Sequence, residues 1–290
     1  MTDEVTSLAP GLYLVATPIG NLEDMTLRAL RVLREADRIA CEDTRQTQKL
    51  LNHFGIAKPK LSLHGHNEAA RTSELLEALQ AGERIAVVSD AGMPGISDPG
   101  MHLAAAALEA GVAVFPVPGA NAALTALVAS GLPTERFLFH GFLPSKAGER
   151  RTTLEKLREG TDERLTVVFY EAPHRIVETL GDLAAVWGEH TRVVMARELT
   201  KLHEEFLRGT VAEVREALTE RDRVRGEIVL LLDAVPEARL AVTKSVEERV
   251  AALGREEGLD ERDALKRVAR ERGISKSDAY RELQRERGKR

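Results

Sequence analysis

The chain has 290 residues and 43% of them are hydrophobic, so it is long enough for two domains that each bury a core. Its formal net charge of −5 argues against a protein whose whole surface coats nucleic acid. A single cysteine, Cys41, excludes an internal disulfide and a cysteine-based metal cluster, so we expect no metal and a cytoplasmic protein.

Apolar runs of strand length alternate with helical segments from the start of the chain. The predicted strands of this first series are 12–17, 38–41, 60–64, 84–89 and 112–117. Such alternation predicts an α/β fold with a mostly parallel sheet. The longest uncharged stretch, 110–134, contains Pro116, Pro118 and Gly119, which favour a strand, a turn and a helix over a membrane span. The first ten residues lack the basic start and apolar core of a secretion signal, so we expect neither export nor a membrane partner.

A second series of strands follows an alanine- and leucine-rich helical segment that leaves the first sheet. The predicted strands are 137–140, 165–170, 192–197, 204–208 and 226–232. Two series predict two sheets, and we divide the chain into an N-terminal α/β domain (1–118), a C-terminal α/β domain (119–235) and a tail (236–290).

The tail has helical periodicity and an excess of basic residues. Three helices are predicted at about 244–257, 261–272 and 276–287, and residues 264–290 hold ten Lys/Arg against four Asp/Glu. This asymmetry fits a basic helical module that binds RNA, or a solvated helical face, and charge alone leaves both open. The candidate RNA-binding residues are Lys266, Arg267, Arg270, Lys276 and Arg281.

Two loops after strands of the first series have the composition of a ligand site. They span 16–21 and 89–100, and between Gly92 and Gly100 the second loop is rich in glycine and proline. Small residues and prolines expose backbone groups, and open α/β sheets bind ligands at the carboxyl ends of their strands. The G-x-G-x-x-G and G-x-x-x-x-G-K-[ST] patterns are absent, which argues against an ordinary dinucleotide enzyme or a P-loop NTPase.

Seven motifs occur in an order that resembles a known family. They are A-T-P-I-G-N-L-E-D (16–24), E-D-T-R (42–45), H-G-H-N-E (64–68), S-D-A-G-M-P-G-I-S-D-P-G (89–100), G-F-L-P (141–144), F-Y-E-A-P-H-R (169–175) and A-R-E-L-T-K-L-H-E-E-F-L-R-G-T (196–210). Together they resemble the ribosomal RNA small subunit methyltransferase I branch of the tetrapyrrole methylase superfamily.

The resemblance implies a fold, a cofactor and a substrate. It implies a homodimer that binds S-adenosyl-L-methionine in the cleft between its two α/β domains. The implied activity is 2′-O-methylation of a cytidine ribose in the decoding region of small-subunit (16S) ribosomal RNA, free or in the 30S particle. The implied cofactor-binding residues are Pro18, Asp90, Ala91, Gly92, Met93, Asn121, Ala122, Tyr170, Glu171 and Leu199.

Methylation of a ribose hydroxyl calls for a group that accepts the proton, because the hydroxyl is only weakly acidic. The candidate catalytic residues are Glu42, Asp43, His64 and Glu171, with His66 and Glu68 beside them in sequence. Glu42 and Asp43 could instead cap the next helix, since acidic residues favour helix N-termini.

Two polar residues of the same loops are candidate RNA contacts. Arg45 could bind a phosphate in a bidentate manner or pair with Asp43, and Asn67 is the second candidate. Two other functions stay open. One is a small-molecule, tetrapyrrole-type methylase, which would need a large apolar cleft, whereas the loops here are polar. The other is a non-catalytic RNA-binding protein of ribosome assembly, which cofactor binding would exclude.

Overall fold

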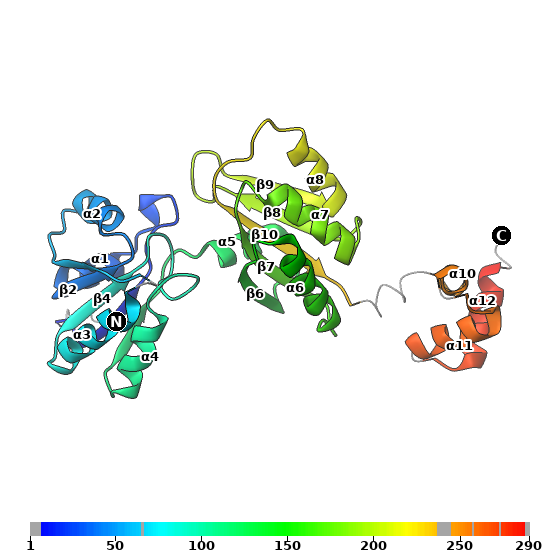
Figure 1. The fold of residues 1–290 in the computed structure, drawn as a ribbon, viewed down its shortest axis with the longest axis horizontal. Coiled ribbons are helices and arrows are strands. Elements are labelled where there is room, and N and C mark those ends of the chain that lie inside the picture. Colours follow the sequence, from blue (N-terminus) through cyan, green and yellow to red (C-terminus); the bar gives the residue numbers. More distant parts are fainter. Residues whose placement is uncertain (1–6, 65–66, 237–244, 257, 273, 288–290) are drawn as a thin grey trace, which may run out of the picture.

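The computed structural model describes residues 7–64, 67–236, 245–256, 258–272 and 274–287 (Figure 1). Within them lie two five-stranded sheets, each covered by helices, and a group of C-terminal helices. The predicted α/β class with a helical C-terminal module is confirmed, and every predicted strand overlaps an observed one.

The first sheet is entirely parallel, with strand order β3-β2-β4-β1-β5. Its strands are β1 (Gly11–Val15), β2 (Arg38–Cys41), β3 (Lys60–Ser62), β4 (Arg84–Val88) and β5 (Val114–Val117). A 3-10 turn, η1 (Leu22–Asp24), follows β1. The helices are α1 (Leu27–Glu35), α2 (Thr44–His53), α3 (Glu68–Gln80) and α4 (Met101–Glu109). Apolar side chains of α1 and α2 cover one face of the sheet and those of α3 and α4 the other, so both faces are buried.

The second sheet is mixed, with strand order β6-β7-β10-β8-β9. Its strands are β6 (Phe137–Phe142), β7 (Leu165–Glu171), β8 (Arg192–Arg197), β9 (Glu205–Thr210) and β10 (Ile228–Ala234). β6 and β7 are parallel, whereas the other neighbours are antiparallel. The helices α6 (Ala147–Glu159), α7 (Ile176–Trp187) and α8 (Val211–Thr219) cover one face.

Helix α5 (Ala122–Ser130) covers the opposite face of this second sheet, although it directly follows the first sheet in the chain. Ala126 and Leu127 are buried against Val168 of β7 and Leu231 of β10. Ile19, from the loop after β1, belongs to the same apolar cluster. The two sheets are therefore held together by shared packing as well as by the chain.

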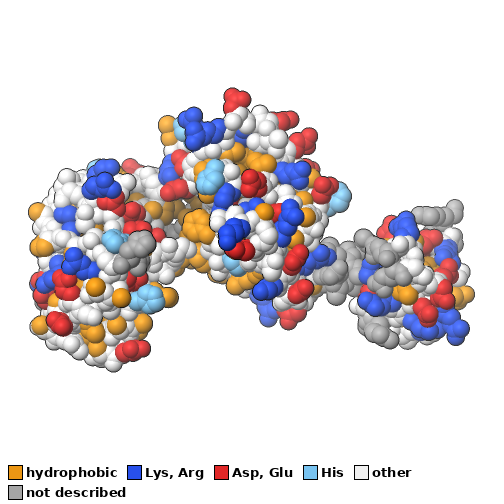
Figure 2. Space-filling model, viewed as in Figure 1, with side chains coloured by type: hydrophobic (Ala, Val, Ile, Leu, Met, Phe, Trp, Pro, Cys, Tyr) orange, Lys and Arg blue, Asp and Glu red, His pale blue; other side chains and the backbone are white. Residues whose placement is uncertain are grey.

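The C-terminal helices form a small core of their own. They are α10 (Val246–Glu256), α11 (Glu261–Glu271) and α12 (Lys276–Arg287), close to the predicted ranges, and their buried centre includes Leu253, Val268 and Leu283. Residues 245–287 carry eleven Lys/Arg and eleven Asp/Glu, because α10 and the start of α11 are acidic. Figure 2 shows blue and red side chains interspersed over these helices, so the module does not present one basic face in this view.

Candidate functional site

A cavity of about 420 Å³ opens between the two sheets, at the carboxyl ends of β1, β4 and β7. Its size lies within the range of small-molecule sites. The lining residues from the first part of the chain are Ile19, Asp90, Ala91, Gly92, Met93, Ile96, Ser97 and Asp98. Those from the second part are Asn121, Ala122, Phe142, Tyr170, Glu171, Ala172, Pro173, Leu199 and 226–229.

The loop after β4 is fixed to the loop after β1 by a short antiparallel bridge. The Thr17 N–H donates to the Gly92 carbonyl at 2.9 Å, and the Gly92 N–H donates to the Thr17 carbonyl at 3.1 Å. Ser89 Oγ donates to the same Gly92 carbonyl at 3.0 Å. Gly92 has φ +85°, and a Cβ there would lie 3.3 Å from Cγ2 of Ile19. This backbone conformation favours glycine, and Gly92 itself lines the cavity.

The opposite wall contains a tight turn that holds Leu199 against the cavity. Glu198 and Thr200, on either side of it, have φ of 53° and 65°, which is costly for residues with side chains. Lys201 Nζ donates to Glu198 at 2.8 Å and to Glu227 at 2.7 Å, and these bonds brace the turn.

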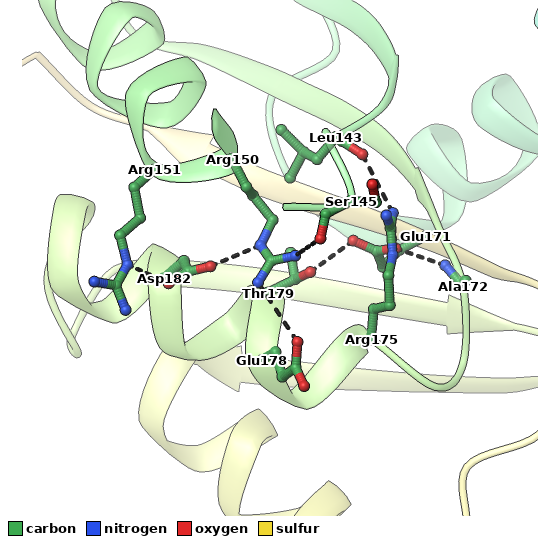
Figure 3. A network of polar contacts seen from close by, with 10 residues as sticks. All are labelled: Leu143, Ser145, Arg150, Arg151, Glu171, Ala172, Arg175, Glu178, Thr179 and Asp182. Carbon is green, nitrogen blue, oxygen red and sulfur yellow. Dashed lines mark hydrogen bonds and ion pairs between the residues drawn. The ribbon is translucent and has the colours of Figure 1, made fainter. Parts of the chain in front are cut away.

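Glu171 ends β7 at the cavity wall, but its carboxylate is already fully engaged (Figure 3). Oε1 accepts from the Ala172 N–H at 2.7 Å and from the Arg175 guanidinium at 2.6 and 2.9 Å. Oε2 accepts from Thr179 Oγ1 at 2.6 Å, and the side chain is 0% exposed. Glu171 therefore fixes the end of β7 to the start of α7. Because both of its oxygens already accept hydrogen bonds, it is poorly placed to accept a proton from a substrate.

A second buried ion pair joins α6 to α7 in the same domain (Figure 3). Arg150 of α6 is 1% exposed, and its Nε donates to Asp182 of α7 at 2.6 Å. Arg151 donates to the other oxygen of Asp182 at 2.5 Å, and Arg150 also donates to the Ser145 carbonyl. These bonds hold α6 against α7, the helix that follows the cavity-lining end of β7.

Three carboxylates gather on the side of the first sheet. Asp98 is half-buried and lines the cavity. Burial and, to a smaller extent, the nearby charges of Glu42 and Asp90 together raise its pKa to about 6. Burial also raises the pKa of Glu42, with a smaller upward effect of Asp90, whereas His64 acts in the opposite direction. The sequence analysis did not single out Asp98, although it lies in the S-D-P-G end of the loop motif.

The remaining catalytic candidates lie beside the cavity lining or have other partners. Asp43 accepts from the Arg45 N–H at 2.8 Å, as the cap of α2, and pairs with the Arg45 side chain at 2.9 Å. Hydrogen bonds from Arg45 lower the pKa of Asp43 to about 2. Glu42 and His64 are not part of the lining, although the charge of His64 acts to lower the pKa of Glu42. Glu68 accepts from the Gly100 N–H at 3.1 Å and so holds the far end of the loop after β4.

Nine of the ten cofactor-binding candidates line the cavity. They are Asp90, Ala91, Gly92, Met93, Asn121, Ala122, Tyr170, Glu171 and Leu199. Pro18 does not, and its neighbour Ile19 takes that place. Asn121 caps α5, because its side chain accepts from the Leu124 N–H at 2.9 Å. Ile96, Ser97, Phe142 and 226–229 line the cavity without having been predicted.

The candidate RNA contacts are mostly engaged within the chain. Arg45 is paired with Asp43 but its side chain is 87% exposed. Asn67 accepts from the His64 N–H at 2.9 Å and donates to the Ser62 carbonyl, so it shapes its own loop. In the tail, three of the candidates form ion pairs: Lys266 with Asp263, Arg267 with Glu271 and Arg281 with Asp278. Lys276 is exposed, whereas His66 and the side chain of Arg270 lie outside the described residues.

Two features are absent from the residues that the structure describes. No helix among them is long and apolar enough to cross a membrane. Nor do their His, Cys, Asp and Glu side chains form a group of three or more that could hold a metal ion.

Comparison with known proteins places this chain in a family. The model of the tetrapyrrole (corrin/porphyrin) methylases matches residues 11–215. A protein of Halalkalibacterium halodurans named ribosomal RNA small subunit methyltransferase I is 48% identical over 267 residues, which cover 89% of each chain. A protein of Synechocystis with the same name is 52% identical over 229 residues, 79% of this chain and 81% of that one.

Solved structures resemble this fold at low sequence identity. The uroporphyrin-III C-methyltransferase of Thermus thermophilus, complexed with S-adenosylhomocysteine, has a TM-score of 0.53 and 23% identity over 79% of this chain and 99% of that one. The methyltransferase CobJ has a TM-score of 0.58 and 19% identity over 79% of this chain and 95% of that one. At these identities the structures show a shared fold, and they do not indicate the substrate of this chain.

Proposed function

Because this chain belongs to the tetrapyrrole (corrin/porphyrin) methylase family, and within it to the ribosomal RNA small subunit methyltransferase I group, we propose that it methylates small-subunit ribosomal RNA in the cytoplasm. It is an S-adenosylmethionine-dependent methyltransferase. The specific acceptor that we propose is the 2′-oxygen of a cytidine ribose in the decoding region. The observation that carries the proposal is the cavity between the sheets, lined by the motifs that relate the chain to this group.

The residues of the cavity fit S-adenosylmethionine, which supplies a methyl group on a positively charged sulfur. Asp90 and Asp98 place two carboxylates in the lining, and negative charges favour a bound cation. Tyr170 and Leu199 provide apolar surface, while the loop 90–93 and the start of α5 at Asn121 provide backbone groups. We propose that these residues hold the cofactor and that Ile19 takes the place expected for Pro18.

The protein contributes to the transfer mainly by positioning the acceptor. Alignment of two reactants supplies on the order of 7–11 kcal/mol of the barrier reduction. The bridge at Gly92 orders the wall formed by the first part of the chain, and the buried hydrogen bonds of Glu171 order the wall formed by the second part. We propose that these ordered walls hold the acceptor ribose in one orientation.

We also propose that the protein acts as a homodimer. Phe137, Leu138 and Phe142 of the edge strand β6 are 42–56% exposed, and Val128 on α5 is 75% exposed. Large exposed apolar residues on an edge strand favour a partner chain. Because Phe142 also lines the cavity, a second copy seated on β6 would lie close to the site.

The C-terminal module is proposed to bind phosphate groups of the RNA. Residues 264–290 are basic, but three of the predicted cations are paired with acids three or four residues away. Such exposed pairs are weak and exchange readily for a phosphate. We therefore expect a modest contribution to affinity, with a salt dependence smaller than ten free cations would give.

The test is methylation in vitro with labelled S-adenosylmethionine and small ribosomal subunits from cells that lack the enzyme. After nuclease digestion, mass spectrometry should find the label in 2′-O-methylcytidine from one position. Label on a base, or in no nucleotide, would contradict the proposal. Label transferred to uroporphyrinogen III instead would favour the small-molecule alternative.

A further inference from the structure

The loop between β8 and β9 meets the loop after β1, although the two loops belong to different sheets. A Cβ atom built on Gly20 would lie 2.5 Å from Cγ and 3.0 Å from Cε of Lys201. It would also lie 3.0 Å from Oγ1 of Thr200. The aliphatic stem of Lys201 therefore packs directly on the backbone of Gly20, and only a glycine leaves room for it.

The charged end of Lys201 lies between two carboxylates of the second domain. Nζ donates to Oε1 of Glu198 at 2.8 Å and to Oε2 of Glu227 at 2.7 Å. Burial alone would lower the pKa of Lys201, but its hydrogen bonds to the two carboxylates outweigh burial and raise that pKa. The hydrogen bond from Lys201 in turn lowers the pKa of Glu198. Lys201 and Glu198 are therefore both charged near neutral pH.

Glu198 extends this contact to the start of β10. Its side chain lies across Gly226, where an added Cβ would approach Cγ and Cδ of Glu198 to 2.5 Å. Its Oε1 also accepts from the Glu227 N–H at 3.1 Å, and its own N–H donates to the Glu227 carbonyl at 3.0 Å. These bonds hold the costly φ of 53° at Glu198. The turn 198–200 and the segment 226–227 therefore form one unit with Lys201.

Each segment that Lys201 contacts carries a residue of the cavity lining. Ile19 precedes Gly20 in the loop after β1 and lines the first wall. Leu199 of the turn and Glu227 line the opposite wall. Ile19 and Leu199 also belong to one apolar cluster. A single side chain thus contacts the supports of both walls, with its stem on one and its ammonium group on the other.

We propose that Lys201 is a positioning residue that sets the distance between the two cavity walls and thereby aligns the cofactor with the acceptor; this inference rests on the proposed function. Lys201 does not line the cavity, so it acts through the lining residues beside its contacts. Methyl transfer is sensitive to such changes, because a misplacement of about 1 Å can lower a rate about 10²-fold.

The test is a double-variant cycle on the contact between Lys201 and Gly20. Lys201→Ala removes the stem and the ammonium group, and Gly20→Ala puts a Cβ atom where the stem lies. Each single variant should lower the rate constant of single-turnover methylation at least about tenfold. In the double variant the added methyl group meets no stem. Its rate constant should therefore stay within about threefold of that of Lys201→Ala instead of falling by the product of the two losses.

The assay separates alignment from stability. The enzyme and S-adenosylmethionine are in saturating excess over small ribosomal subunits, so an unfolded fraction of the enzyme does not lower the rate constant. Calorimetry without RNA should give a cofactor Kd at least about threefold higher in each single variant, with the same lack of additivity in the double variant. The Tm of every variant should lie within about 4 °C of the parent value, because the ion pairs of Lys201 are partly exposed.

Lys146→Ala is the matched control. Lys146 Nζ donates to Glu149 at 3.0 Å at the start of α6, its side chain is 78% exposed, and it does not line the cavity. The variant removes the same group from an ion pair that contacts neither wall. Its rate constant and its cofactor Kd should stay within about twofold of the parent values.

The inference would be overturned if Lys201→Ala kept the parental rate constant and cofactor affinity, or if the losses of the two single variants multiplied. A lower Tm with an unchanged rate constant would also refute it, and Lys201 would then serve stability alone. An equal loss in Lys146→Ala would refute it as well. If the parent protein methylates no ribosomal RNA, the proposed function fails, and the cycle in cofactor affinity then decides the inference by itself.

Discussion

Replacing Glu171 with glutamine separates a structural role from a catalytic one. The amide has nearly the same shape, and Thr179 can rotate its hydroxyl to accept from the new NH₂ group. What is lost is the negative charge that compensates Arg175, whose side chain is 15% exposed. Removing one partner of a buried pair costs 3–5 kcal/mol in other proteins. Arg175 also donates to the Leu143 carbonyl, so we expect the lower end, about 3 kcal/mol.

The assay is thermal unfolding followed by circular dichroism. A loss of about 3 kcal/mol corresponds to a fall in Tm of roughly 6–12 °C for a folded unit of this size. Affinity for S-adenosylmethionine should fall as well, because Glu171 and its neighbours Tyr170 and Ala172 line the cavity. The pH dependence of turnover should stay unchanged, since no catalytic proton is assigned to Glu171.

Glu178→Gln is the matched control. Its side chain is 72% exposed and its nearest cation, Arg150, is 3.7 Å away, so Tm should change by less than about 2 °C. The structural reasoning would be refuted if Glu171→Gln kept the parental Tm and cofactor affinity while its turnover fell 100-fold. That result would return Glu171 to the role of base.

Three further predictions follow from other parts of the molecule. Gly92→Val should weaken cofactor binding more than tenfold by calorimetry, because a branched side chain disfavours φ +85° and would press on Ile19; tight binding would contradict this. Two arginines lower the pKa of Glu205 from 4.5 to about 2, so roughly 3 kcal/mol of stability is present above pH 4.5 and is lost as the pH falls toward 2. Denaturant unfolding should show that loss, and Glu205→Gln should abolish it; an unchanged slope in the variant would refute the assignment. Removing residues 238–290 should leave cofactor affinity intact but weaken ribosomal-subunit binding and reduce its salt slope, whereas a dimeric truncated protein with unchanged affinity and slope would make the tail a solvated face.

The sequence predicts the elements of this fold better than their arrangement. Apolar runs locate every strand, because each strand contributes apolar side chains to a sheet. Nothing in the runs of the second series, however, distinguishes the antiparallel pairs around β10 from parallel ones. The predicted third strand extends to 64, whereas β3 ends at Ser62, and the His64 N–H donates to the Asn67 side chain instead of to a neighbouring strand. The domain boundary at 118/119 stays a prediction.

The position of the cavity could be predicted from the sequence, whereas the environment of its carboxylates could not. Loops at the carboxyl ends of parallel strands meet at one edge, so the small residues of 90–93 were expected at a ligand. The properties of Asp98 depend on Glu42, which is distant in sequence and brought near by strand order. The engagement of Glu171 likewise depends on Thr179, which lies in the first turn of α7. In the tail, Asp263 and Lys266 are three residues apart on one helix and form an ion pair. A count of charges over the tail does not reveal such pairing.

The most direct test of the central claim is a map of ribose methyl groups on small-subunit ribosomal RNA. The RNA would come from cells that lack the gene, and from the same cells complemented with the parent protein or with Gly92→Val. We predict that one 2′-O-methylcytidine in the decoding region is absent without the gene, is restored by the parent protein and is not restored by the variant. A map that is identical with and without the gene would contradict the assignment of this cavity to ribosomal RNA methylation.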